Sequence, residues 1–166
     1  IPLGIAIAQD PKCQYIRVNS AMAKLMGLSS TANASKSAPL EERPTYKVFR
    51  QSQEIPASEL PMQQAASSGK PVLDVELDLV TKEGTPPVKL LGNAAPLFDE
   101  QGQCRGSIGA FVDITERKRI EDQERFLVEA RNILAASLDY QTILNNLAQS
   151  IVPQLADWCS IHILEA

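Results

Sequence analysis

The middle of the chain constrains the fold most, because three segments of strand character follow one another there with only short turns between them. Residues 72–81 alternate aliphatic with acidic side chains over most of their length, which predicts a strand with one solvated face. Turns that end at Gly84 and Gly102 separate it from the strands predicted at 87–97 and 105–113. Strands joined by such short turns must be antiparallel.

The N-terminal part predicts two further strands and two helices. Residues 3–8 and 14–18 have strand patterns on either side of a turn. Asn19 lies at the N-cap position of a helix predicted at 20–26, and a second helix is predicted to start with Ser58 as its N-cap and to end at Gly69. The segment around Tyr46 to Phe49 is predicted as a short helix or an extended piece. The pattern as a whole predicts an α+β fold with a five-stranded antiparallel sheet and helices on one side.

The last predicted strand is apolar at Ile108, Ala110 and Val112 and runs into a charged helix without an intervening loop. Asp113 or Thr115 can cap that helix. With Asp113 as the N-cap, Glu116 would stand three residues into the helix and complete an Asp version of a capping box. Such a junction ties the end of the sheet to the position of the helix, which favours transmission over catalysis.

The helix predicted at 114–138 has an apolar stripe at spacings of three, four and seven residues. This pattern is typical of a coiled coil and predicts a homodimer whose seam lies along the helix. The seam consists of Ile120, Phe126, Leu127, Ala130, Ile133 and Leu134. Arg117, Lys118 and Arg119 at its start are interpreted as a solvated face.

Composition excludes several classes of function. The net charge of -4 gives no indication of nucleic-acid binding, which usually requires a basic surface. No apolar run is long enough to span a membrane. Three scattered cysteines and a single histidine favour reduced thiols in the cytosol and argue against a zinc site. The chain starts without Met and ends directly after an apolar run, and we expect it to be a piece of a longer protein. No nucleophile and base pair, phosphate loop or carboxylate dyad stands out, so this segment is not expected to be an enzyme.

Several stretches together resemble a PAS domain over about residues 1–118. The ending Asp113-Ile-Thr115 is specific for that family when it follows this pattern. The other matching stretches are Leu3-Gly-Ile-Ala-Ile, Val18-Asn-Ser-Ala-Met-Ala-Lys-Leu-Met-Gly27, Glu59-Leu-Pro-Met-Gln-Gln-Ala-Ala-Ser-Ser-Gly69, Ala95-Pro-Leu-Phe-Asp-Glu-Gln-Gly102 and Gly106-Ser-Ile-Gly-Ala-Phe-Val. Residues from about 139 resemble the first helix and strand of a GAF domain. The resemblance thus implies a PAS sensor at 1–113, a signalling helix at 114–138 and a GAF fragment at 139–166.

The resemblance also implies a cavity that can hold haem, flavin or another small molecule, and which ligand is bound stays unknown. His162 is the only histidine and lies outside the PAS-like part, which argues against a His-ligated haem. Neither Cys13 nor Cys104 has the Asn-Cys-Arg setting of a LOV-type flavin site. Met22, Met26 or Met62 could in principle ligate a haem iron, although Met on a helix face is far more often part of the core. Asn19 could contact a ligand, although capping is the simpler interpretation.

The expected function is a non-catalytic sensory module of a cytoplasmic bacterial signalling protein, and the family resemblance favours a sensor histidine kinase. A signal would pass through Asp113, Ile114 and Thr115 to the dimeric helix. Two alternatives stay open: a ligand-free scaffold for protein interaction or dimerisation, and the sensor module of a cyclic-dinucleotide enzyme. A small-molecule ligand in the PAS cavity is a possible partner, and neither nucleic acid nor membrane is expected as one.

Overall fold

The computed structural model describes residues 2–136, 144–145, 148–149, 151–152 and 157–161, with the side chains of residues 133–136 left out. The chain divides after Thr115 into two units, residues 1–115 and 116–166. The first unit consists of β1 (Leu3–Ala8), β2 (Ile16–Val18), α1 (Ser20–Met26), η1 (Leu40–Glu42), β3 (Lys47–Arg50), β4 (Gln53–Glu54), η2 (Ala57–Glu59), α2 (Pro61–Ser68), β5 (Val72–Val80), β6 (Val88–Phe98) and β7 (Cys104–Asp113). The second unit begins within α3 (Thr115–Ala136).

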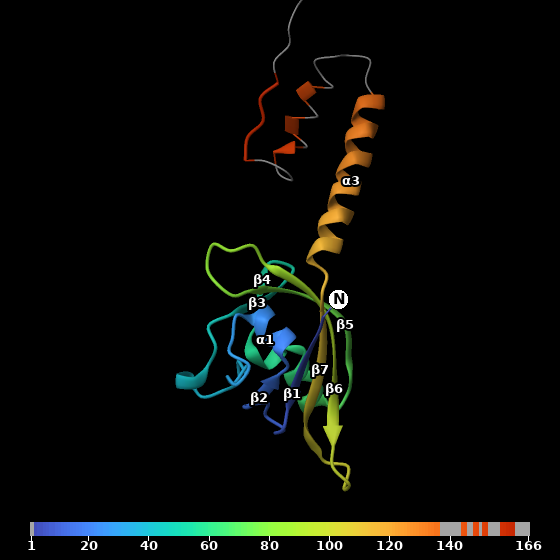
Figure 1. Cartoon of the computed structure of the whole chain (residues 1–166). Helices are drawn as coiled ribbons and strands as arrows, with labels where there is room; N and C mark the ends of the chain where they lie inside the picture. The colour runs from blue at the N-terminus through green and yellow to red at the C-terminus, as the bar shows by residue number, and fades with distance from the viewer. Residues whose placement is uncertain (1, 137–143, 146–147, 150, 153–156, 162–166) are drawn as a thin grey trace, which may run out of the picture. The chain divides into compact units, whose positions relative to one another are not determined.

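The strands of the first unit form one antiparallel sheet in the order β2-β1-β7-β6-β5-β3-β4 (Figure 1). The α+β architecture agrees with the sequence, but the prediction of five strands is wrong because the sheet has seven. The two extra strands, β3 and β4, form a hairpin on the outer edge of β5. Gln51 and Ser52 form its turn with φ angles of 50° and 65°. This left-handed pair resembles a type I′ turn, which usually contains Asn and Gly, so Gln51 and Ser52 carry no turn signal.

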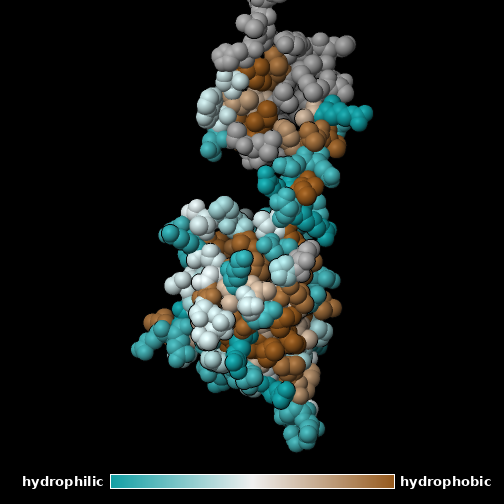
Figure 2. Space-filling view, viewed as in Figure 1, coloured by the Kyte–Doolittle hydropathy of each residue, from teal (hydrophilic) through white to brown (hydrophobic). Residues whose placement is uncertain are grey.

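The buried face of β7 is not the one with the aliphatic pattern. Phe111 is buried, and its ring occupies the space above Gly92 and Gly109, where an added Cβ would lie 2.3 Å and 2.6 Å from the ring. Ile108 is on the opposite face and pairs with Ile7 of β1. Hydrophobic residues gather over β1, β7 and β6 in Figure 2, and Leu3 and Ile108 are exposed to 46% and 36%. At β1 and β7 the sheet is therefore apolar on both faces, and the small residues Gly92 and Gly109 leave the space that receives Phe111.

The two α-helices of the first unit cover one face of the sheet, with α1 on β1 and α2 on β6 and β7 (Figure 1). Asn19 is the N-cap of α1, and its Oδ1 accepts a hydrogen bond from the Met22 amide at 2.9 Å. The prediction that Ser58 caps α2 is wrong: Ser58 lies in the short helix η2, and α2 starts at Pro61 with no side-chain cap. Proline at the first helical position has no N–H to satisfy, so the start needs less capping.

The loop between α1 and β3 is anchored by Tyr46 and Lys36. The buried Tyr46 hydroxyl donates to the Ala34 carbonyl at 2.7 Å. Lys36 Nζ donates to the carbonyls of Pro44 and Tyr46 at 3.1 Å and 2.8 Å and lies 5.3 Å from the centroid of the Tyr46 ring. The Tyr46 and Lys36 side chains thus hold the loop between α1 and β3 in place.

Tyr46→Phe is expected to lower the free energy of unfolding by about 1–3 kcal/mol at pH 7, because the Ala34 carbonyl loses its buried donor. Burial raises the pKa of the Tyr46 phenol, so the unfolded chain loses this proton first, above about pH 10. The contribution is complete below that pH and lost as the pH rises further. In denaturant titrations the difference in free energy of unfolding between the native chain and Tyr46→Phe should therefore be smaller near about pH 11 than at pH 7. A stability difference that stays the same from neutral to alkaline pH would contradict this prediction. Tyr15→Phe, at a residue that is 46% exposed, is the control.

Candidate functional site

The interior of the first unit holds a small apolar cavity between the sheet and the helices. Its volume is about 60 Å³, and Met22, Met26, Met62 and Phe111 are among the residues that line it. Ligand pockets usually measure roughly 300–1,000 Å³, so this space admits no flavin or haem with the side chains in these positions. The three methionines lie in the hydrophobic core. They are packed there as core residues, as their helical positions favoured.

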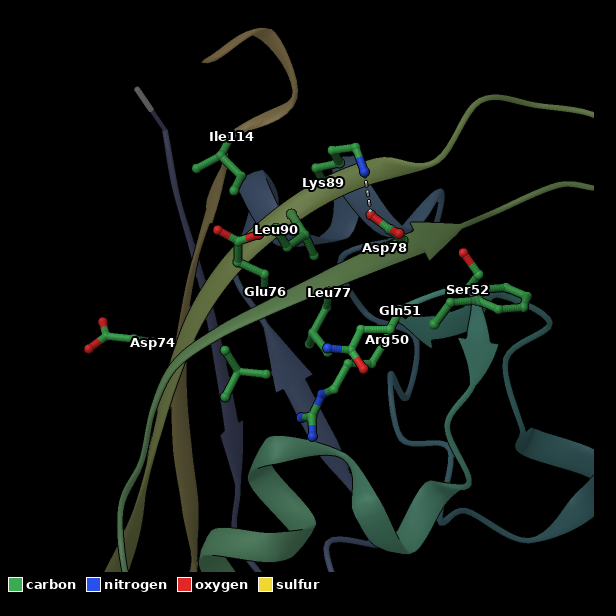
Figure 3. Close-up of a pocket in the computed structure, with 12 residues that line it drawn as sticks. Arg50, Gln51, Ser52, Asp74, Glu76, Leu77, Asp78, Lys89, Leu90 and Ile114 are labelled. Carbon is green, nitrogen blue, oxygen red and sulfur yellow. Dashed lines mark hydrogen bonds and ion pairs between the residues drawn. The ribbon is translucent and has the colours of Figure 1, made fainter. Parts of the chain in front are cut away.

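A second pocket, of about 680 Å³, lies on the side of the sheet where the β3–β4 hairpin leaves β5 (Figure 3). β3 pairs with β5 only from Lys47 to Phe49, opposite Val80 to Asp78. After Phe49 the chain turns away from β5 at Gln51 and Ser52. Residues 74–77 of β5 are therefore not paired with β3, and they line the pocket. The pocket thus exists because the hairpin is shorter than the strand that it borders.

The junction between β7 and α3 is held by three hydrogen bonds in the first unit. Asp113 Oδ1 accepts from the Thr115 amide at 2.8 Å. The Ile114 amide donates to the Lys89 carbonyl at 2.8 Å, and the Lys89 amide donates to Thr115 Oγ1 at 2.9 Å. The backbone of Lys89, at the start of β6, is therefore bound on both sides to the two residues that lead into the helix.

The helix begins at Thr115, two residues after Asp113, and this changes the predicted cap. Glu116 is the second residue of the helix and forms an ion pair with Arg119 at 3.8 Å. The predicted capping box, which needs Glu116 at the third helical position, is therefore wrong. The Asp113 carboxylate nevertheless satisfies the first helical amide, so this side chain still orients the start of the helix.

Lys89 and Ile114 belong to both the pocket and the junction. Both residues line the pocket of about 680 Å³. Lys89 Nζ also lies 3.1 Å from Asp78 Oδ1, and Asp78 lines the same pocket (Figure 3). The Lys89 and Asp78 side chains are partly exposed, so this ion pair adds little stability by itself. Lys89 thus lines the pocket, while its backbone amide and carbonyl form two of the hydrogen bonds at the junction.

The comparisons with known proteins agree with this architecture. A family model described as the PAS fold matches residues 1–119. The chain belongs to the PAS fold family. This confirms the PAS part of the resemblance seen in the sequence, and the proposed GAF segment stays a prediction, since most of residues 139–166 lie outside the described residues. Comparison with curated proteins finds no match.

Several solved structures are similar to this chain. A sensory box histidine kinase/response regulator from Burkholderia thailandensis E264 has 20% identity and a TM-score of 0.45, with 76% of this chain and 88% of that one covered. The PAS domain of the fruit-fly ELK potassium channel has 15% identity and a TM-score of 0.41, with coverages of 68% and 85%. The PAS domain of BvgS from Bordetella pertussis has 18% identity and a TM-score of 0.39, with coverages of 75% and 83%.

The Asn19 side chain forms three hydrogen bonds within the PAS fold. Its Oδ1 also accepts from the Ile5 amide at 3.1 Å, and its Nδ2 donates to the Leu3 carbonyl at 2.8 Å. Together with the bond to Met22, these contacts tie α1 to β1. The side chain therefore caps α1 and also holds it against β1.

Two residues of the predicted seam, Ile120 and Leu127, have exposed side chains on α3, at 47% and 65%. Phe126 and Ala130 are partly buried, and the side chains of Ile133 and Leu134 lie outside the described residues. Ion pairs such as Arg117–Glu121, at 2.7 Å, run along the same helix, and the hydrogen bond from Arg117 lowers the pKa of Glu121. The exposed aliphatic residues on a charged helix are what a dimer seam requires, and the dimer stays a prediction.

The three cysteines are free, and within the described residues no group of His, Cys, Asp and Glu could hold a metal ion. His162 lies outside the described residues. Among the described helices, none has the length and hydrophobicity needed to cross a bilayer.

The sequence did not single out Arg50 or Lys89. Both are charged residues in strands, and such residues usually face solvent. The only available signal was strand alternation: Arg50 stands two residues after the buried Val48 and therefore on the same face of β3. Nothing in the sequence pointed to the backbone role of Lys89, because its partners Ile114 and Thr115 are far along the chain.

Proposed function

We propose that this PAS domain is a sensory module that relays a signal from its sheet to a dimeric helix through Asp113, Ile114 and Thr115. The observation that carries the proposal is that Lys89 lines the outer pocket and also binds the junction through its backbone amide and carbonyl. A shift of the Lys89 backbone would therefore change both the wall of the pocket and the start of the helix.

The mechanism needs two arrangements of α3 that differ in their affinity for the signal. A ligand or partner that shifts Lys89 changes the Ile114 and Thr115 bonds and thereby the direction in which the helix leaves the sheet. Two copies of α3 then repack along their seam. A ligand shifts this equilibrium only by its differential affinity for the two arrangements, typically about 1–3 kcal/mol of coupling.

The output is proposed to be a cytoplasmic histidine kinase activity in a longer protein, with a cyclic-dinucleotide enzyme as the alternative. The short connection at the junction and the stripe on α3 support an output downstream of the helix, and they do not distinguish the two enzymes. The module itself is proposed to be non-catalytic, and a GAF domain is proposed to follow it.

A ligand-free scaffold is the second candidate function. The interior cavity of about 60 Å³ favours it, because the core is filled by its own methionines and Phe111. A scaffold of this kind would signal through protein contacts on the sheet and on α3. The sensor is still the preferred proposal, because the outer pocket of about 680 Å³ is large enough for a small-molecule ligand.

Native mass spectrometry of the purified chain separates the two candidates. The sensor predicts a dimer mass that includes a small ligand, or a dimer that takes one up from a metabolite mixture. A bare dimer that takes up nothing would favour the scaffold. A monomer at all concentrations would contradict both, since each requires the seam on α3.

A further inference from the structure

Arg50 is the most unusual residue of the outer pocket. It lines the pocket, and its Nε is a buried nitrogen for which the described part of the chain provides no hydrogen-bond partner. A buried guanidinium N–H is costly to leave unpaired, so such an atom in a native fold calls for an explanation. The Lys89 ammonium in the same pocket, in contrast, has Asp78 beside it.

The strand geometry explains why Arg50 is isolated. Val48 and Arg50 point to the inner face of the sheet, whereas Asp78 is directly opposite Phe49 and points outward. In Figure 3 the Arg50 guanidinium lies on the α2 side of β5, and the carboxylates of Glu76 and Asp78 lie on the other side. The Asp74 carboxylate points away from it in the same view. The carboxylates that line the pocket thus leave Arg50 without an anionic partner.

The surroundings of Arg50 define what could bind it. Val75, Leu77 and Leu90 supply an aliphatic wall. The volume of about 680 Å³ is in the range for small-molecule ligands. The side chains that line the pocket are more acidic than basic, with Asp74, Glu76 and Asp78 against Arg50 and Lys89. This balance disfavours a doubly charged phosphate and tolerates a single negative charge that is held at Arg50.

We propose that the outer pocket binds a small organic carboxylate, with its two oxygens accepting from the Nε–H and an Nη–H of Arg50 and its apolar body against Val75 and Leu77. A guanidinium presents two parallel donors in the geometry that a carboxylate matches. The site is separate from the interior cavity between sheet and helices. What binding does to α3 rests on the proposed function, whereas binding itself does not.

The test uses the whole 166-residue chain and the NMR signals of its arginine Nε–H groups. Sodium benzoate is the probe, benzamide is its neutral isostere, and inorganic phosphate and sodium chloride are added at equal ionic strength. We expect benzoate to shift the Arg50 Nε–H signal saturably, with at least tenfold weaker effects from the other three. Arg50→Lys should weaken benzoate binding at least tenfold, and Arg105→Lys, at an exposed residue of β7, should leave it unchanged.

The proposal is overturned if benzoate gives no saturable shift, if phosphate or benzamide binds as well, or if the two lysine variants bind benzoate equally. Circular dichroism checks that Arg50→Lys is folded, and if it is not, the comparison of benzoate with benzamide on the native chain decides. Benzoate binding without any change in α3 would contradict the relay and leave the site intact. If changes at the junction alter α3 but benzoate does not bind, the proposed carboxylate ligand is contradicted and the proposed relay is not.

Discussion

Leu127→Asp is expected to convert a dimer of this chain into a monomer, with self-association weakened at least about 100-fold. Leu127 is 65% exposed on α3 and belongs to the predicted seam. In a dimer each copy would lose the burial of one leucine, worth about 1.5–3 kcal/mol, and would also have to bury a carboxylate. Sedimentation equilibrium over a wide concentration range measures the change.

Val128→Asp is the matched control for this experiment. Val128 is adjacent, is 57% exposed and receives the same charge, but it lies outside the predicted seam. It should keep the affinity of the native chain within a few-fold. A native chain that is monomeric at high concentration, or equal effects of the two substitutions, would contradict dimerisation through this seam.

Thr115→Val is expected to lower the free energy of unfolding by about 1–3 kcal/mol and to release α3 from the sheet. Valine keeps the shape of the side chain but removes the hydroxyl that accepts from the Lys89 amide at 2.9 Å. The Ile114 bond to the Lys89 carbonyl is next to it and should weaken as well. Amide hydrogen exchange at Lys89 and Ile114 and a denaturant titration measure the two effects.

Thr31→Val provides the matched control for the junction. Thr31 is exposed, and its hydroxyl forms a hydrogen bond with the exposed Ser29 hydroxyl, at 3.0 Å. Its replacement should change stability by less than about 0.5 kcal/mol. If the Lys89 and Ile114 amides exchange equally fast in both variants, the Thr115 hydroxyl does not hold the junction.

The sequence predicted those elements that carry strong local signals. β1, α1 and the three long strands have alternation, caps or glycine turns, and the structure places them within a few residues of the prediction. The β3–β4 hairpin was missed because Gln51 and Ser52 adopt a left-handed turn that neither residue signals. Tertiary packing selects that turn, since β3 pairs with β5.

The candidate site was less predictable than the fold, because it depends on contacts between distant residues. Asp113 and Thr115 could be singled out because a strand that runs into a helix is visible in the sequence. Their bond partner Lys89 could not, since a backbone contact leaves no trace in side-chain pattern. The aliphatic pattern of Ile108, Ala110 and Val112 likewise gave no hint that Ser107, Gly109 and Phe111 form the buried face of β7.

The central claim is that the junction sets the arrangement of the two α3 helices, and pulsed electron paramagnetic resonance tests it most directly. A nitroxide at Val128→Cys, with Cys104 and Cys159 replaced by serine, reports the distance between copies, and Cys13 is fully buried and stays unlabelled. We predict that Thr115→Val shifts or broadens the distance distribution and that Thr31→Val does not. The same distribution in both variants as in the otherwise native chain would contradict the claim.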